Sequence, residues 1–284
     1  DIVSLLNKRA QIAIDVGATK KSLGKSVYCP DREREILKMI ESLNSGPLKP
    51  AALEAIYREI MSSSLSLEKK LKIAFLGPVA TFTHQAALKR FGSQVNYLSC
   101  GSIAEVFIEV EKGNADYGVV PIENSIEGAV NFTLDMFMDS DLKICSQVIL
   151  NISHNLLSTG PLAKVKKVYS NPMVFGQCRI WLQKNLANAQ LIEVPSTTRA
   201  SQIAAKEKNS AAIASALAAK IYGLNIVARG IEDSPHNVTR FFVIGKDEVP
   251  HTGNAQTSVL VSILDRVGAL HALLASFRAG RAGK

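Results

Sequence analysis

The sequence predicts a multi-domain chain in which an all-α segment, residues 1–70, precedes a two-lobed α/β region, residues 71–248, and an incomplete α+β unit, residues 256–284. Two observations support this division. In the first segment apolar residues recur every three or four positions, which is the period of an amphipathic helix. From Lys72 onward short apolar runs alternate with helical stretches, which indicates strands covered by helices. A polar stretch, 246–255, then precedes one more strand and one more helix.

Three helices are expected in the first segment. The first begins near Ile2 and is interrupted between Gly17 and Gly24, the second begins after Pro30, and the third begins near Pro50. Polar side chains lie on the inward faces of these helices, where a charge needs a partner. They predict either a pocket for a polyanion or an internal network of salt bridges. The residues concerned are Arg9, Lys20, Arg32, Glu33, Ser64 and Glu68.

Strands and helices alternate through the α/β region, which predicts a mainly parallel sheet with covered faces, divided into two lobes with a cleft between them. Lobe 1 is expected to comprise residues 71–149 and 228–248, and lobe 2 residues 150–227. The expected strands are 73–76, 95–98, 117–122, 142–150, 165–170, 190–194, 211–214, 225–228 and 239–245. The expected helices are 81–91, 103–112, 129–138, 174–186, 197–208 and 215–222.

Small hydrogen-bonding side chains gather where these strands end and the next helices begin. Ligands of α/β proteins usually bind at such ends, and a helix start with free N–H groups can hold a carboxylate. Each junction taken alone is also compatible with an ordinary turn or helix cap, and no phosphate-binding glycine motif is present. Taken together, the junctions predict a carboxylated substrate in the cleft. They lie at Thr81, at Glu123 to Ser125, at Ser170, at Gln177, at Ser196 and at Asn237 to Phe241.

Composition limits the function classes. The 284 residues include 33 Lys and Arg against 25 Asp and Glu, a net charge of +8, without a basic face interleaved with aromatic residues. This favours small anionic substrates over nucleic acid. No apolar run is long enough to span a membrane, no signal-peptide pattern is present, and the Cys and His residues show no disulfide or metal-site spacing. We therefore expect a cytoplasmic protein without a cofactor or metal.

The helical segment resembles the all-helical chorismate mutase, an intertwined dimer that converts chorismate to prephenate. The resemblance rests on Leu5-Leu-Asn-Lys-Arg9, Val16-Gly17, Lys20, Tyr28-x-Pro-x-Arg-Glu33 and Ser64-x-x-x-Glu68. It implies a homodimer in which the substrate carboxylates are bound by Arg9, Lys20 and Arg32. Glu33 would then hold the substrate hydroxyl, Ser64 would line the pocket, and Glu68 would donate a hydrogen bond to the ether oxygen. Such a rearrangement relies on positioning and on stabilising the charge that develops on that oxygen.

The α/β region resembles prephenate dehydratase from about residue 72 to 246. The matching stretches are Gly77-Pro-x-x-Thr-Phe-Thr83, Gly118 to Ser125, Ala212-Ile-Ala-Ser215, Tyr222-Gly-Leu224, Ile231-Glu-Asp233 and Asn237-x-Thr-Arg-Phe241. Ala80 stands where members usually have glycine. The resemblance makes Thr239 the group that assists departure of the ring hydroxyl while carbon dioxide leaves. It places Thr81, Phe82, Glu123, Asn124, Ser125, Ser170, Gln177, Ser196, Thr197, Arg240 and Phe241 at the substrate.

Residues 256–284 resemble the start of an ACT regulatory domain, which in dehydratases binds phenylalanine around a Gly-Ala-Leu motif. Here that motif is Gly268, Ala269 and Leu270, and the later Glu-Ser-Arg-Pro motif is absent. We therefore expect an incomplete unit in which phenylalanine, the effector that the resemblance implies, no longer inhibits.

Two alternatives remain open at this point. The mutase family has a further arginine upstream on its first helix, so one alternative is a dehydratase with impaired mutase activity and lost feedback. The other is a non-catalytic binder of small anions or amino acids, because a two-lobed α/β cleft also suits proteins that resemble periplasmic binding proteins. The stretch Asn237-x-Thr-Arg-Phe241 favours the enzyme over the binder.

Overall fold

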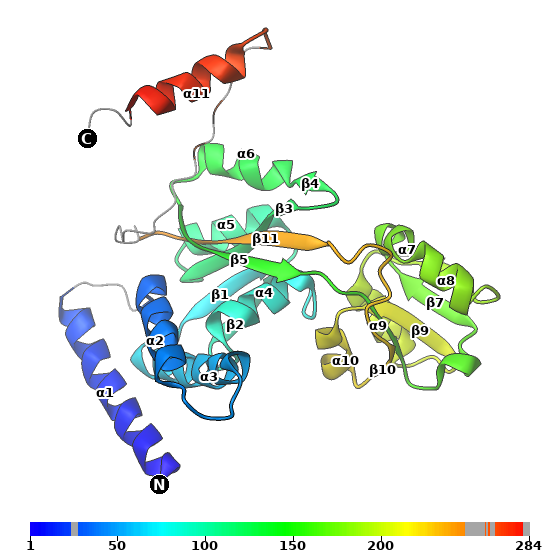
Figure 1. Cartoon of the computed structure of the whole chain (residues 1–284), viewed down its shortest axis with the longest axis horizontal. Coiled ribbons are helices and arrows are strands. Elements are labelled where there is room, and N and C mark those ends of the chain that lie inside the picture. Colours follow the sequence, from blue (N-terminus) through cyan, green and yellow to red (C-terminus); the bar gives the residue numbers. More distant parts are fainter. Residues whose placement is uncertain (24–27, 248–258, 260, 262–264, 281–284) are drawn as a thin grey trace. The chain divides into compact units, whose positions relative to one another are not determined.

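The computed structural model describes residues 1–23, 28–247, 259, 261 and 265–280 (Figure 1). The chain forms two compact units, Asp1–Val249 and Pro250–Lys284. The first contains the helical segment together with both sheets of the α/β region. In the part of the chain that the structure describes, no helix is long and apolar enough to cross a membrane.

Three helices open the first unit: α1 (Ile2–Ser22), α2 (Pro30–Leu43) and α3 (Pro50–Glu68). Proline begins both α2 and α3, where its missing N–H costs nothing and its fixed φ suits a helix start. Helix α1 ends at Ser22, within the interruption expected between Gly17 and Gly24, but it continues through Gly17 itself. Gly17 is instead a point of close approach. A Cβ atom there would lie 2.9 Å from Cγ of Glu68, so only glycine lets α1 and α3 pack this tightly.

The first sheet has the strand order β2-β1-β3-β11-β5, and the short β4 pairs with β3. Its strands are β1 (Lys72–Leu76), β2 (Asn96–Cys100), β3 (Tyr117–Asn124), β4 (Gly128–Ala129), β5 (Lys143–Asn151) and β11 (Val238–Gly245). One apolar core lies between this sheet, α4 (Phe82–Phe91) and the helical segment, and includes Tyr28 and Leu65. The other packs against α5 (Ile103–Glu111) and α6 (Asn131–Asp139).

The second sheet has the order β10-β6-β9-β7-β8. Its strands are β6 (Asn155–Ser158), β7 (Lys167–Ser170), β8 (Gln190–Glu193), β9 (Ser210–Ala214) and β10 (Asn225–Ala228). One core includes residues of α9 (Thr197–Ala204) and α10 (Ala216–Tyr222), and the other includes residues of α7 (Pro172–Gln177) and α8 (Arg179–Asn185). Both faces of the sheet are therefore buried.

Three expectations about the α/β region need correction. The sheets are mixed rather than mainly parallel, because β11 runs antiparallel to β3 and β5, and β6 runs antiparallel to β9 and β10. Strands β4 and β6 were not expected. The single helix expected over 174–186 is two helices that meet at Cys178. The antiparallel pairs arise because the chain leaves the first sheet after β5, builds the second, and returns as β11 between β3 and β5.

Two chain segments connect the sheets, and they are hydrogen-bonded to each other. The backbone N–H of Ile152 donates to the carbonyl of Asn237 at 2.8 Å, and the N–H of Ile231 donates to the carbonyl of His154 at 2.9 Å. This pairing brings the ends of β3 and β11 to the same place as the segment that leaves β5.

The second unit contains α11 (Ala269–Gly280), preceded by Gly268 at φ +83°. That φ lies in the left-handed region that glycine adopts without strain. The strand expected over 258–264 falls almost entirely outside the described residues.

Candidate functional site

The turn between β1 and α4 holds its polar groups in fixed positions. Thr81 caps α4, since its Oγ1 accepts the N–H of His84 at 3.3 Å, and it donates to the carbonyl of Leu76 at 3.1 Å. Ala80 has φ +75°, a conformation that favours glycine, the residue that the resemblance leads us to expect at this position. Its N–H donates to Nδ1 of His84 at 3.2 Å. Hydrogen bonds to His84 of α4 therefore hold the conformation of this turn.

Residues at the starts of α9 and α10 also hold this turn. Thr198 donates to the carbonyl of Val79 at 3.0 Å, and Ser215 donates to the carbonyl of Ala80 at 3.2 Å. Ser196 caps α9 and Thr197 is its first residue, so this helix start lies beside the turn that carries Thr81. The structure thus brings together the predicted residues Thr81, Ser196 and Thr197. The sequence analysis missed the anchoring hydroxyls of Thr198 and Ser215.

Asn124, the last residue of β3, fixes the surroundings of Thr239. Its Oδ1 accepts the backbone N–H groups of Ile126 at 2.9 Å and Glu127 at 3.0 Å. Its Nδ2 must therefore face the other way, where it donates to Oγ1 of Thr239 at 2.7 Å and to Oδ1 of Asn237 at 2.9 Å. Because Oγ1 of Thr239 accepts this bond, its own O–H hydrogen is available for a second partner. Among the described residues none accepts that hydrogen.

Ser125 and Gln177 complete this cluster. Ser125 fastens the end of β3 to the start of β11, because its Oγ donates to the carbonyl of His236 at 2.8 Å and accepts the N–H of Val238 at 2.9 Å. Gln177 ends α7, and its Oε1 accepts from Nδ2 of Asn237 at 3.2 Å. Side chains from β3, β11 and α7 therefore meet, through Asn237, within one hydrogen-bonded group that leads to Thr239.

Four predicted residues are placed differently. Ser170 is fully buried, and its hydroxyl donates to the carbonyl of Ile213 within the second sheet. Phe241 is part of an apolar core. Arg240 points to the opposite face of β11 from Thr239, as strand alternation requires, and its Nη1 lies 3.6 Å from the carboxylate of Glu123. The structure does not bring these four side chains to the cluster around Thr239.

A pocket of about 420 Å³ opens beside Gln177 and Asn237. Carboxylates from Glu127, Glu232 and Asp233 line it, so a dianionic substrate would be repelled there. The helix starts at Thr81 and Thr197 present backbone N–H groups, a setting that favours the binding of carboxylates.

Phe82, the first residue of α4, contacts the same cluster through a histidine that the sequence analysis did not assign. Its ring lies edge-on to the ring of His154, with 5.6 Å between the centroids. His154 in turn lies with Nε2 2.7 Å from Oε1 of Gln177. The only sequence signal was a histidine four residues after the predicted strand 142–150, which is too common a pattern to indicate a role.

In the helical segment, four of the six predicted residues meet between α1 and α3. Arg9 donates to the hydroxyl of Ser64, and Nζ of Lys20 lies 3.1 Å from Oε2 of Glu68. Arg9 and Lys20 lie eleven residues apart on α1, and Ser64 and Glu68 lie four apart on α3, so each pair falls on one face of its helix. Two cations are thus held beside a hydroxyl and a carboxylate, an arrangement that suits the binding of a dicarboxylate.

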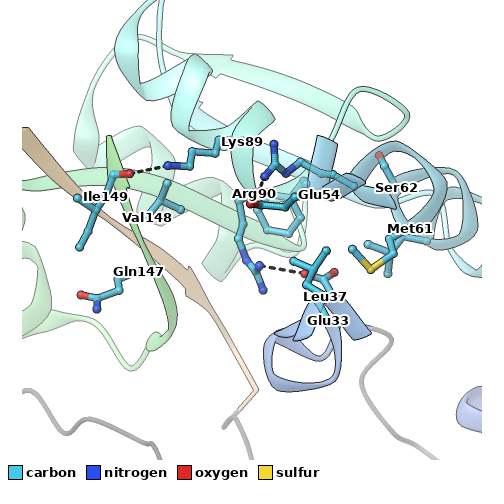
Figure 2. A pocket seen from close by; sticks show the side chains of 13 residues that line it. Glu33, Leu37, Glu54, Met61, Ser62, Lys89, Arg90, Gln147, Val148 and Ile149 are labelled. Carbon is cyan, nitrogen blue, oxygen red and sulfur yellow. Dashed lines mark hydrogen bonds and ion pairs between the residues drawn. The ribbon is translucent and has the colours of Figure 1, made fainter. Parts of the chain in front are cut away.

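The two predicted residues of α2 lie elsewhere. Arg32 is exposed and pairs with Glu35 at 2.9 Å, whereas Glu33 is largely buried and pairs with Nη1 of Arg90 on α4 at 2.9 Å (Figure 2). Burial raises the pKa of the Glu33 carboxyl above its usual range, and the nearby Arg90 only partly offsets this effect. Arg90 also donates to the hydroxyl of Tyr28. The start of α2 is therefore bound to the α/β region rather than to α1 and α3.

A smaller pocket, about 180 Å³, lies at this junction (Figure 2). It is lined by side chains of α2, α3, α4 and β5, among them Glu33, Met61, Lys89, Arg90 and Val148. Lys89 reaches across it to the carbonyl of Ile149 at 2.9 Å. The junction is a packed contact between the helical segment and the first sheet.

Most of the apolar side chains of α1 are exposed in the single chain. A helix with so much apolar surface in water is typical of a surface covered by a partner. The exposed residues are Ile2, Val3, Leu5, Leu6, Ile12, Ile14 and Val16.

Cys178 is fully buried, and burial raises the pKa of its thiol to about 12. It is therefore a protonated, packed side chain rather than a nucleophile. Among the described residues no group of three or more His, Cys, Asp or Glu is arranged to hold a metal ion.

Comparison with known families agrees with the division of the chain. A family model of type II chorismate mutase matches residues 1–69, and one of prephenate dehydratase matches residues 73–249. The bifunctional chorismate mutase/prephenate dehydratase of Aquifex aeolicus (strain VF5) is 49% identical over 282 residues, which are 98% of this chain and 78% of that protein. The protein of the same description from Escherichia coli (strain K12) is 31% identical over 296 residues, covering 95% of this chain and 75% of that protein.

A solved structure is similar as well. The prephenate dehydratase of Arthrobacter aurescens in complex with L-Phe matches with a TM-score of 0.63 and 29% identity, covering 74% of this chain and 72% of that chain. The similarity in sequence and in structure therefore extends through the α/β region.

Proposed function

Since the chain belongs to the family of bifunctional chorismate mutase/prephenate dehydratases, we propose that its two reactions take place at two separate groups of residues. The chain converts chorismate to prephenate, and prephenate to phenylpyruvate, on the route to phenylalanine. We assign the mutase to residues 1–70 and the dehydratase to residues 71–248. Within the dehydratase, lobe 1 comprises 71–149 and 228–248, and lobe 2 comprises 150–227.

In the dehydratase, Thr239 assists the loss of the ring hydroxyl. The bond to the leaving carboxylate breaks, its electron pair enters the ring, and the bond from the ring to the hydroxyl breaks as the ring becomes aromatic. Thr239 donates its O–H proton so that the hydroxyl leaves as water, and it regains a proton from solvent. The Nδ2–H of Asn124, 2.7 Å from Oγ1, stabilises the negative charge that develops on this oxygen.

Substrate carboxylates are proposed to bind at the two helix starts. Thr81 and Phe82 begin α4, and Ser196 and Thr197 begin α9. These donors come from both lobes, so a bound substrate would join them across the cleft. Ser125 and Gln177 hold the walls of the site, while Ser170 and Phe241 support it from within the sheets.

The observation that most supports the dehydratase assignment is the free O–H of Thr239 beside an Asn124 amide of fixed orientation. The test supplies prephenate and follows phenylpyruvate in the wild type, Thr239→Ser and Thr239→Val. Valine keeps the shape and removes the hydroxyl, so turnover should fall by about 10²- to 10⁴-fold, which is the scale of acid catalysis. Serine should retain much of the activity. Wild-type turnover by Thr239→Val would overturn the assignment.

In the mutase, Arg9 and Lys20 bind substrate carboxylates, Ser64 lines the pocket and Glu68 donates to the ether oxygen. As the chain stands, Glu68 accepts from Lys20 at 3.1 Å, so the donor role requires the carboxyl to carry a proton. Arg32 and Glu33 would join the pocket only if the start of α2 were rearranged. We propose that a second copy of the chain covers the exposed apolar face of α1 and completes the site, which gives a cytoplasmic homodimer.

Residues 256–284 are proposed to belong to an ACT regulatory unit. Gly268, at φ +83°, directly precedes α11, where Ala269 and Leu270 begin the helix. The Arthrobacter aurescens prephenate dehydratase was solved in complex with L-Phe, which supports phenylalanine as the effector class in such relatives.

A further inference from the structure

His154 lies in the segment that leaves the first sheet for the second, and it is buried. Its backbone N–H donates to Oε2 of Glu232 at 2.8 Å, and its carbonyl accepts from Ile231, so the second connecting segment holds its main chain. Its ring contacts Phe82 of the first lobe and Gln177 of the second. The side chain therefore contacts one site residue from each lobe. It does not line the pocket beside Gln177.

The hydrogen bonds around Gln177 determine which atom of each amide faces which neighbour. Two backbone N–H groups bind Oδ1 of Asn124, so its Nδ2 donates to Oδ1 of Asn237. The Nδ2 of Asn237 then faces Gln177. That Nδ2 donates to Oε1 of Gln177 at 3.2 Å, and Nε2 of Gln177 donates to Oε1 of Glu127 at 3.3 Å. The atom of Gln177 that faces His154 is therefore its oxygen.

The tautomer of His154 follows from this orientation. An amide oxygen only accepts, so the ring nitrogen 2.7 Å away, Nε2, must carry the hydrogen. The other nitrogen, Nδ1, is buried and has no hydrogen-bond partner among the described residues. Burial lowers the pKa of His154, although the bond to Gln177 and the nearby Glu232 raise it. A neutral ring with its hydrogen on Nε2 donates to Gln177 and leaves no N–H unpaired at the buried Nδ1.

We propose that His154 is a positioning residue of the dehydratase, whose Nε2–H fixes the amide of Gln177 and, through Asn237 and Asn124, the donor on Thr239. Four consecutive bonds of 2.7, 3.2, 2.9 and 2.7 Å connect the imidazole to the hydroxyl of Thr239. Without Nε2–H, Oε1 of Gln177 loses its shortest bond and the amide can turn. Asn237 would then lose its acceptor. The proposal rests on the role assigned to Thr239.

The test compares His154→Gln with His154→Met. Both side chains are unbranched, of similar length and without the aromatic contact to Phe82, but only glutamine can place an N–H where Nε2 lies. We expect His154→Met to lower kcat for prephenate by about 10- to 100-fold, the scale of a misplaced catalytic group, with KM within about twofold. His154→Gln should stay within about threefold of the wild type. Equal kcat values for the two variants would overturn the proposal.

Two further measurements separate positioning from folding. Thermal unfolding should be similar for the two variants, and a mutase assay on each confirms that the rest of the chain is intact. In a Gln177→Leu background, His154→Met should cause no additional loss, because its effect passes through Gln177. A full additional loss there would overturn the proposal.

Failure of the role assigned to Thr239 can be told apart from failure of this inference. If Thr239→Val retained wild-type turnover while the two His154 variants still differed, the catalytic assignment would fall. His154 would remain the residue that positions Gln177.

Discussion

The α/β region and the helical segment present their predicted sites in different states. Around Thr239 the side chains are already joined by hydrogen bonds of 2.7–3.2 Å that run between two sheets. In the helical segment, Arg9, Lys20, Ser64 and Glu68 meet between two helices, but the start of α2 is held by Arg90 of α4. One site is organised within a single chain, and the other is only half assembled.

The difference follows from how each region buries its apolar surface. Both sheets have helices on both faces, so their strand ends are held in place and can carry a fixed polar network. Helix α1 instead leaves apolar residues such as Leu5 and Ile12 exposed, because α3 covers only one side of it. The proposed second copy of the chain would cover this exposed face of α1 and complete the site.

The largest expected effect tests the organised site. Asn124→Asp keeps Oδ1 for the backbone N–H groups but replaces the donor that faces Thr239 with an acceptor. The new carboxylate would both repel negative charge on Oγ1 and accept a hydrogen bond from the O–H of Thr239, which would turn this hydrogen away from the substrate. We expect kcat for prephenate to fall by about 10²- to 10³-fold, as when an oxyanion donor is lost, with mutase activity unchanged. A dehydratase that tolerates this change would mean that the amide is not part of the machinery.

An intermediate effect is expected from the half-assembled site. Ile12→Glu places a charge on the exposed face of α1, which should weaken the dimer and lower mutase activity by about tenfold or more, since a buried unpaired charge is costly. Ile180 on α8 is equally exposed, at 67% against 62%, so Ile180→Glu is the matched control. Sedimentation and both enzyme assays provide the readout. If the two variants behave alike, the face of α1 is not an interface.

The smallest expected effect is a dependence of stability on pH within the organised region. Burial lowers the pKa of His84 and of His154 below their ordinary 6.5, so the unfolded chain binds protons first as the pH falls. Stability is thus fully present above about pH 6.5 and declines below it, by at most about 1.4 kcal/mol per pH unit for each histidine.

Chemical denaturation between pH 7 and pH 5 measures this decline. His84→Gln should reduce the slope, because it removes one imidazole whose pKa is lowered by burial. An identical slope in the wild type and the variant would show that this imidazole does not contribute to the dependence of stability on pH.

The sequence predicts the helices and most strands of this fold because their apolar periods are long and regular. It cannot predict β6, a four-residue strand between two polar segments, or the antiparallel return of β11, because strand order is decided by long-range packing. The break at Cys178 also escapes it, since no proline or glycine directly marks that position.

The candidate site was predictable to a similar degree. Motifs at strand ends identified Thr239, Asn124 and Gln177, all of which lie in one hydrogen-bonded cluster. They could not show that Arg240 faces away from it or that Ser170 is bonded within its sheet, because a motif does not say which side of a strand faces the ligand. His154 escaped notice because its role depends on neighbours 23 residues away along the chain.

The most direct test of two independent sites is to supply chorismate to Thr239→Val and follow both products over time. The wild type should release phenylpyruvate. Thr239→Val should convert chorismate at the wild-type rate but accumulate prephenate, because only the α/β site has lost its proton donor. If the variant instead released phenylpyruvate as fast as the wild type, or failed to consume chorismate, the separation of the two sites would be contradicted.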